Sequence, residues 1–193
     1  MITARFLDEN IKYTGEQLQG SWIYHVLGIE GDTMVSFIGE CDVLREYMVD
    51  TEDLANGETI YSEQMLHFIA EYFEVEMEKT ILKQRLLAVV VEETLNNMLG
   101  THQVSREGDD LFDKESKLTV SIATTSPMSS LIHFGINISS KNTPVKTKGL
   151  ADYRIDPKKF ADEVLKRYKK EEESVHFASK KVKLVSLYEL EQV

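Results

Sequence analysis

The chain has 193 residues, and its 33 acidic against 22 basic side chains give a formal net charge of −11 and a sequence pI near 5.0. Proteins that hold nucleic acid through phosphate contacts concentrate Lys and Arg, so this balance argues against a nucleic-acid partner. With 42% hydrophobic and 28% charged residues, the composition excludes disordered, collagen-like and membrane-spanning classes, and the length predicts one globular domain over residues 1–193.

Compartment and metal content are indicated by what the sequence lacks. Met1 is not followed by a basic region and an apolar core, and no window approaches 18 apolar residues, so we expect a cytoplasmic protein without membrane contact. The single cysteine, Cys41, excludes an internal disulfide and a multi-thiolate metal site. The five histidines show no metal-ligand spacing, and no protein-built metal site is predicted.

Short elements are predicted for the first part of the chain. Apolar residues at helical spacing predict an amphipathic helix over 16–28. Alternation from Met34 to Val43 predicts a strand that contains Gly39, and an aromatic-rich strand is expected over 65–73. The polar segment 50–63 between these two strands is predicted to be a surface loop.

A broad apolar stripe over residues 77–99 is the strongest helix signal in the sequence, and Gly100 is placed to end that helix. We expect this helix to be buried and central. After it, Gly108 marks the bend of a hairpin whose arms are 103–107 and 111–113.

Two more strands and a second long helix complete the pattern. Alternation over Lys117–Thr124 and Ser130–Ser139 predicts an antiparallel pair. The pair Asp156-Pro157 has the composition of a helix start, and the charged run 169–173 is expected at the helix end. Segment 183–190 alternates weakly and is predicted as an edge strand or a tail. The sequence therefore predicts an α+β domain in which helices pack on a mostly antiparallel sheet.

Four segments, in the same order, resemble the catalytic core of the biotin protein ligases and their lipoate ligase relatives. They are the helix at 81–99, Arg106–Phe112, Lys117–Ile122 and Gly135–Ile138. At higher similarity the chain resembles the domain of unknown function 366 family of archaea and bacteria. The segments that carry this second resemblance are Gly28–Asp32, Arg106–Asp110, Ser121–Thr124 and Ser126-Pro127. Both resemblances imply the ligase superfamily fold, which is like that of the class II aminoacyl-tRNA synthetases.

The ligase resemblance implies a site for negative charge, because those enzymes activate a carboxylate with ATP and pass the acyl group to a lysine. Lys117 matches the ligase strand lysine and is the first candidate for a catalytic residue. Arg106 matches the basic residue of the ligase hairpin. Asp109 stands where the ligases have Asn, and Asp110 matches their Asp; either would bind Mg²⁺ or accept from a ligand amine or hydroxyl. An ordinary turn at Gly108 explains the same residues equally well.

The glycine-rich loop with which the ligases wrap the adenylate has no counterpart here. The corresponding segment, Gly39–Arg45, contains one glycine and two acids. It cannot cradle phosphates with backbone N–H groups in the same way. ATP with Mg²⁺ is therefore a cofactor that the resemblance suggests and that no phosphate loop supports.

Polar residues on two adjacent strands predict the floor of a pocket. His133 and Asn137 project from one face of their strand, and Ser121 shares a face with Lys117. A solvated sheet face would explain the same pattern. His67 alternates with aromatic residues and is expected to be a buried interior histidine.

Three functions remain open. The leading one is binding of a small carboxylate or nucleotide-like ligand, as a ligase-type or acyl transferase or its inactive descendant, with Gly39 allowing close approach of backbone. The second is a non-catalytic binding or scaffold module, in which a carboxylate neutralises Lys117 and an apolar surface forms a homodimer. The third is ATP-independent acyl transfer through Cys41, although free cysteines are most often buried.

Overall fold

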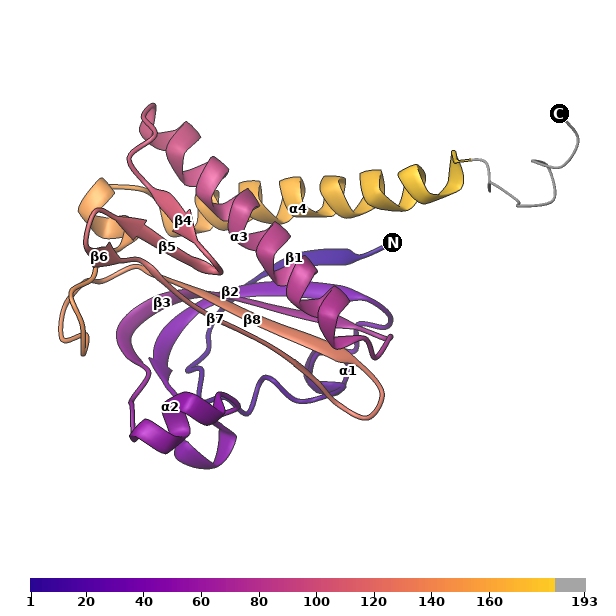
Figure 1. Cartoon of the computed structure of the whole chain (residues 1–193), viewed down its shortest axis with the longest axis horizontal. Coiled ribbons are helices and arrows are strands. Elements are labelled where there is room, and N and C mark those ends of the chain that lie inside the picture. The colour runs from indigo at the N-terminus through magenta and orange to yellow at the C-terminus, as the bar shows by residue number, and fades with distance from the viewer. Residues whose placement is uncertain (183–193) are drawn as a thin grey trace, which may run out of the picture.

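A five-stranded mixed sheet forms the middle of the molecule (Figure 1). Its strand order is β1-β2-β3-β8-β7, in a computed structural model that describes residues 1–182. The strands are β1 (Thr3–Asn10), β2 (Thr33–Asp42), β3 (Tyr61–Tyr72), β7 (Thr119–Thr125) and β8 (Ser130–Asn137). β1 pairs with β2 in parallel, whereas the other three neighbouring pairs are antiparallel. The predicted α+β class with a mostly antiparallel sheet is confirmed, and the predicted element at 183–190 lies outside the described residues.

A small second sheet stands beside the edge strand β7. It consists of β4 (Ser105–Glu107), β5 (Asp110–Asp113) and β6 (Ser116–Lys117), so the predicted hairpin with its bend at Gly108 is confirmed. The predicted single strand over 117–124 is wrong, because it divides between the two sheets at the fully buried Leu118. The backbone N–H of Leu118 donates to the Leu111 carbonyl, and its carbonyl accepts from Asn137 N–H. Leu118 therefore ties the small sheet to the large one.

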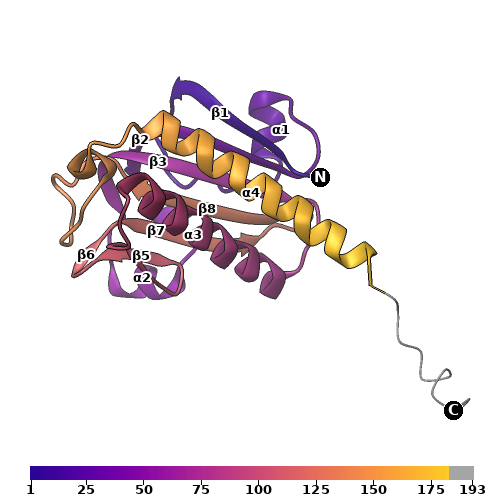
Figure 2. The ribbon, with the colours of Figure 1, turned by 90° about the horizontal axis from the view of Figure 1, so that it is seen from above.

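Two long helices, α3 (Met77–Leu99) and α4 (Pro157–Lys180), lie side by side across one face of the main sheet (Figures 1 and 2). The start of α4 is confirmed, because the Asp156 side chain accepts from Lys159 N–H and Pro157 occupies the first turn. The run 169–173 does not end the helix, since Lys and Glu are strong helix formers and the helix continues to Lys180. Gly100 ends α3 with φ +67°, as predicted.

The apolar stripe predicted on α3 is buried only along part of its length. Leu87, Val91 and Leu95 are fully buried against the sheet, whereas Leu82 is 63% exposed and Met98 is 42% exposed. The helix therefore covers the sheet with one face and leaves apolar residues in solvent at both of its ends.

The main core fills the space between the sheet and the two long helices. Leu66 and Phe68 of β3 and Phe134 of β8 lie fully buried in this layer. At the helix interface the hydroxyls of Tyr72 and Tyr168 are hydrogen bonded at 2.7 Å. A smaller core covers part of the other sheet face, where Phe37 and Ile69 pack.

Three predictions for the short elements need correction. The helix predicted over 16–28 is only α1 (Trp22–Leu27), because Ser21 adopts φ +65° and cannot continue a right-handed helix. The predicted loop over 50–63 contains α2 (Thr51–Asn56), which Asp50 caps by accepting from two backbone N–H groups. No element was predicted where β1 lies. Two single-turn 3-10 helices complete the structure, Arg45–Tyr47 and Leu150–Tyr153.

Within residues 1–182, neither α3 nor α4 nor any shorter helix combines the length and the apolar character needed to cross a membrane.

Replacing Phe134 by Ala is expected to lower the free energy of unfolding by about 3–5 kcal/mol, because the fully buried ring leaves a cavity in the main core. The matched change Phe177→Ala removes a ring that is 65% exposed on α4 and is expected to cost within about 0.5 kcal/mol. Urea unfolding followed by circular dichroism measures both values. Equal losses for the two variants would contradict this assignment of the core.

Candidate functional site

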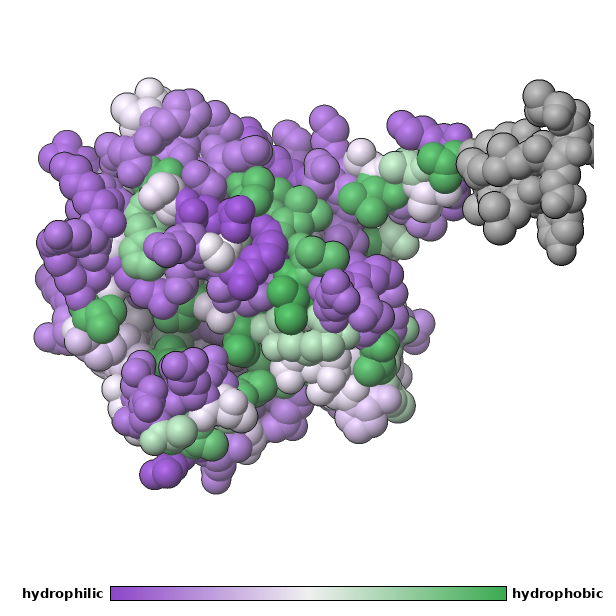
Figure 3. Space-filling model, in the orientation of Figure 1, coloured by the Kyte–Doolittle hydropathy of each residue, from purple (hydrophilic) through white to green (hydrophobic). Residues whose placement is uncertain are grey.

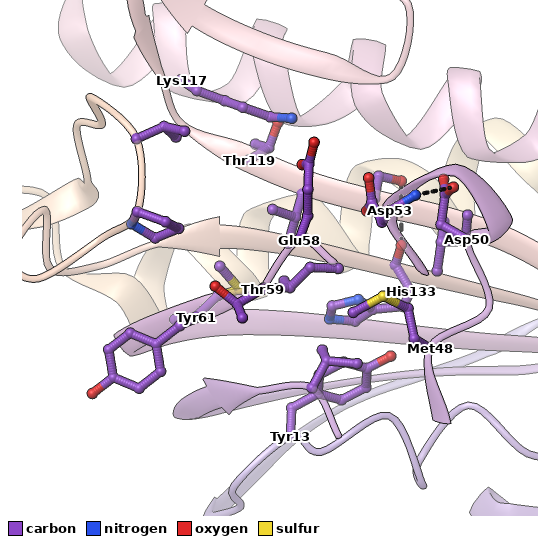
Figure 4. Close-up of a pocket in the computed structure, with 18 of the residues that line it drawn as sticks. Tyr13, Met48, Asp50, Asp53, Glu58, Thr59, Tyr61, Lys117, Thr119 and His133 are labelled. Atoms are coloured by element: carbon purple, nitrogen blue, oxygen red, sulfur yellow. Dashed lines mark hydrogen bonds between the residues drawn. The ribbon is translucent and has the colours of Figure 1, made fainter. Parts of the chain in front are cut away.

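A cavity of about 720 Å³ lies on the sheet face opposite α3 and α4, between β3, β8 and β7 and the segment 43–61 that contains α2 (Figure 4). Apolar side chains form much of its wall. Those from segment 43–61 and from β7 are Val43, Tyr47, Met48, Val49, Ile60, Val120 and Ile122. Ligand sites are typically concave, mostly apolar and furnished with a few polar groups, and this cavity has that character.

The polar floor of the cavity comes from β8. His133 and Asn137 both line it, and they are only 3% and 4% exposed. The alternation of a strand places residues four apart on one face, so the same-face prediction for these two is confirmed, and they are not simply solvated. Gly135 lies between them, and a Cβ atom there would come within 2.2 Å of the Met65 sulfur.

Ser121 does not belong to this floor. It pairs with Phe134 across the sheet, on the face that the long helices cover, and its hydroxyl accepts from the Gln84 side chain of α3 at 2.8 Å. The prediction that Ser121 and Lys117 share one strand face is wrong, because the chain changes sheets at Leu118. Ser121 still borders the cavity, together with Thr119, Val120 and Ile122 of the edge strand β7.

A hydrogen-bonded pair of histidines fixes the orientation of the floor residue His133. His67 is fully buried, as predicted, and its Nδ1 lies 3.0 Å from His133 Nε2, while its Nε2 lies 3.3 Å from the Gly39 carbonyl oxygen. Burial lowers the pKa of His67 to about 3 and also lowers the pKa of His133, with His67 as a second cause. Tyr13 stacks on His133 with ring centroids 3.8 Å apart. Both histidines are therefore neutral and fixed in orientation near pH 7.

Lys117 lies at the rim and is already paired. Its ammonium is 2.8 Å from Asp110 Oδ2, and both side chains are about one-third exposed. Asp109 also lines the cavity, and its carboxylate binds Arg85 at 2.5 Å and Gln84 at 2.9 Å. Burial raises the pKa of Asp109, against the opposing effect of Arg85. The structure thus brings Lys117, Asp109 and Asp110 to one rim.

The segment 43–61 adds an acidic wall, which consists of Asp50, Asp53 and Glu58. The Lys117 ammonium and the Glu58 carboxylate point toward the same part of the cavity (Figure 4). Burial, then Asp50 and then Glu58 raise the pKa of Asp53. The cavity is thus lined by five carboxylates and a single ammonium, a charge balance that repels polyphosphates.

Two predicted site residues lie elsewhere. Arg106 is exposed outside the cavity lining, and its guanidinium donates to the Gly108 carbonyl. Gly39 is needed for packing, because a Cβ atom there would lie 1.8 Å from the carbonyl oxygen of Ile11. The backbone that approaches Gly39 is therefore the protein's own.

Cys41 is unsuited to acyl transfer. Its side chain is fully buried, and burial raises the pKa of the thiol to about 12. A thiol without access to solvent and without thiolate character is a poor nucleophile. The hypothesis of transfer through Cys41 is therefore set aside.

Sequence reasoning missed Tyr13 and the acidic wall. Tyr13 follows a strand that was not predicted, and nothing in its local sequence marks it as a pocket residue. The acidic wall was visible only as a polar loop, and its position over the sheet depends on the tertiary fold. Within the described part of the chain, no group of three or more His, Cys, Asp or Glu residues could hold a metal ion.

The family model described as "Domain of unknown function (DUF366)" matches residues 2–183. "Uncharacterized protein MJ0805" of Methanocaldococcus jannaschii is 35% identical over 173 residues, which cover 86% of this chain and 77% of that protein. The solved structure "Protein of Unknown Function from Pyrococcus horikoshi" is 35% identical and superposes with a TM-score of 0.91 over 96% of this chain and 100% of that one.

The biotin protein ligase of Aquifex aeolicus "in complex with biotin and ATP" is 14% identical, with a TM-score of 0.58 over 87% of this chain and 69% of that one. At this identity the similarity concerns the fold alone. The fold is that of the biotin and lipoate protein ligases, as the sequence resemblance implied.

The two buried histidines make stability depend on pH. The folded chain resists protonation of His67 down to about pH 3, whereas an unfolded histidine takes up a proton near pH 6.5. The contribution of these two histidines to the free energy of unfolding is therefore complete above pH 6.5. It is lost as the pH falls below that value, by about 1.4 kcal/mol per pH unit for each histidine. Urea unfolding between pH 7 and pH 5 measures this slope.

The slope should become shallower in a His67→Gln variant, because one buried titrating group is gone. The control is His25→Gln, which changes an exposed histidine on α1 and should keep the wild-type slope. A His67→Gln slope equal to the wild-type slope would show that this histidine pair does not titrate as its burial requires.

Proposed function

The chain belongs to the DUF366 family, and from this premise we propose that it binds a small organic acid in the cavity above β3, β8 and β7. The observation that supports the proposal is a cavity with apolar walls, a buried polar floor and one ammonium, Lys117, at its rim. Such a site suits a molecule with an apolar body and a carboxylate at one end.

Lys117 is well placed to receive that carboxylate. An ammonium has three donors, and the Lys117 ammonium forms an ion pair with Asp110 at 2.8 Å. The backbone of Lys117 is held by pairing with Phe112 and by donation of its N–H to the Lys146 carbonyl. A ligand carboxylate would join Asp110 as a second anionic partner of an ammonium that is already in position.

ATP does not fit this site. Asp50, Asp53 and Glu58 line the cavity, these three carboxylates form no ion pair with a basic side chain among the described residues, and their charge would repel the phosphates of ATP. An acyl or ligase-type transfer through an adenylate is therefore not part of the proposal. The same charge, with −11 overall, supports a protein that works without nucleic acid. A cytoplasmic location remains a prediction.

A non-catalytic scaffold is the second candidate, and two observations favour it. Lys117 is neutralised by Asp110, as that hypothesis requires. Apolar residues are also exposed where β3 ends and α3 begins: Phe73 (45%), Val75 (55%), Met77 (43%) and Leu82 (63%). Hydrophobic residues gather over the first half of α3 on the face shown in Figure 3. A homodimer through this surface would bury them.

Lys117→Ala is expected to weaken binding of a carboxylate ligand about tenfold or more, because a charge-assisted hydrogen bond is lost. Biotin, lipoate and octanoate are the first probes, measured by thermal shift and calorimetry. The control is Lys146→Ala, which removes a lysine that is 68% exposed and paired with Glu115. Equal binding by the two variants would refute the role of Lys117, and pyrophosphate release with ATP would refute the absence of adenylation.

Leu82→Asp tests the dimer. Sedimentation of the wild-type chain is expected to show a concentration-dependent dimer, which the substitution shifts toward monomer by placing a charge in an apolar interface. Leu44→Asp places the same charge at a position that is 42% exposed, shortly after the end of β2 and thus at the opposite end of the sheet from the end of β3. A monomeric wild-type chain, or equal dissociation of the two variants, would contradict a dimer through this surface.

A further inference from the structure

Three buried polar groups of the cavity have no hydrogen-bond partner among the described residues. They are the Asn137 side-chain amide, the Tyr13 hydroxyl and His133 Nδ1, and their side chains are no more than 4% exposed. The single buried polar atom in residues 1–182 that is sealed from solvent without a partner is the Ser36 hydroxyl, so these three groups open into the cavity. Unpaired polar groups at the bottom of a pocket indicate what a ligand must supply.

The protonation of His67 follows from its neighbour. A carbonyl oxygen can only accept, so the contact with the Gly39 carbonyl requires that His67 Nε2 carries the proton. Burial keeps the ring neutral, because it lowers the pKa of His67 to about 3. His67 Nδ1 is therefore an acceptor.

The protonation of His133 follows from that of His67. Since His67 Nδ1 accepts, the proton in the 3.0 Å contact must be on His133 Nε2. A neutral imidazole carries one N–H, so His133 Nδ1 has a free lone pair. The chain of contacts from Gly39 through His67 thus fixes His133 as a hydrogen-bond acceptor toward the cavity. Sequence spacing could not indicate this, because Gly39, His67 and His133 come from three different strands.

The two ends of the floor are chemically different. Asn137 lies four residues from His133, which at a rise of about 3.3 Å per residue separates them by about 13 Å along β8. The Asn137 end is next to Lys117, because the Asn137 N–H donates to the Leu118 carbonyl. The Lys117 end therefore offers donors, and the His133 end offers an acceptor.

From this arrangement we propose that His133 Nδ1 is a specificity-determining acceptor, and that it selects ligands with a neutral N–H group of the azole or amide type. The group is neutral because both histidines are uncharged and an ammonium on this floor would lose its hydration. Tyr13, stacked on His133, offers a hydroxyl beside the same end. The inference rests on the proposed function only in assuming that the ligand occupies this cavity.

The test uses benzimidazole, which has an N–H donor, and 1-methylbenzimidazole, which has the same ring without that donor. Nitrogen-15 NMR of the histidine side chains in the wild-type protein is expected to show the proton of His133 on Nε2. Benzimidazole should bind at least tenfold more tightly than the methylated probe and should shift the His133 Nδ1 signal. A proton on His133 Nδ1, equal affinities of the two probes, or no benzimidazole binding at millimolar concentration would overturn the proposal.

Variants separate recognition from folding. His133→Phe keeps an aromatic ring against Tyr13 and should abolish the preference between the two probes, and His133→Leu, which also lacks an acceptor, serves the same purpose if the Phe variant does not fold. His67→Phe should reduce the preference, because nothing then holds the His133 proton on Nε2 and the Nδ1 tautomer, which cannot accept, becomes populated. His25→Phe should leave the preference unchanged. A preference that survives both His133 variants would assign it to another residue.

Octanoate titrations of the same samples distinguish this inference from the proposed function. Octanoate carries a carboxylate but no N–H group, so its binding, compared between the wild-type chain and Lys117→Ala, reports on the acid contact and not on His133 Nδ1. If the preference for benzimidazole is found and octanoate does not bind, the acid contact fails and the His133 subsite stands. If octanoate binds and the preference is absent, the subsite fails and the acid contact stands.

Discussion

The rest of the structure depends on the burial of one face of β3 and β8 under the two long helices. Leu66 and Phe68 on β3 and Phe134 on β8 fill the layer beneath α3 and α4. Because side chains of a strand alternate between faces, this burial also decides where the intervening residues point. His67 and His133 are turned to the opposite face, where no long helix covers the sheet, and a cavity forms above them. Packing on one side of the sheet therefore produces the polar floor on the other.

The charge of the site is set by a different part of the chain. The segment after β2 folds into α2 and brings Asp50 and Asp53 over the cavity. One of these carboxylates has a local structural task, since Asp50 caps α2. Lys117 remains the single cationic group among the lining residues.

How far the sequence could predict the site depended on the range of the interactions involved. His133 and Asn137 were placed together correctly, because alternation within one strand is a local rule. Ser121 was misplaced, because the chain leaves one sheet and enters another at Leu118, and no local pattern signals that change. Arg106 was assigned by analogy to a ligase hairpin, and its side chain turns back to the Gly108 carbonyl instead. Tyr13 was missed because its contact with His133 joins residues 120 positions apart in the sequence.

By itself, the sequence determined the fold class, the long helix 77–99 with its end at Gly100 and the start of α4. Periodicity, capping and glycine content are properties of short segments, so they can be read without the rest of the chain. Only the tertiary structure decided which polar residues meet in the cavity, that Cys41 is buried, and that the acids surround a single lysine. The direction of the His67 and His133 hydrogen bonds depends on a carbonyl from a third strand. Such arrangements are set by packing between distant segments, which local sequence patterns do not encode.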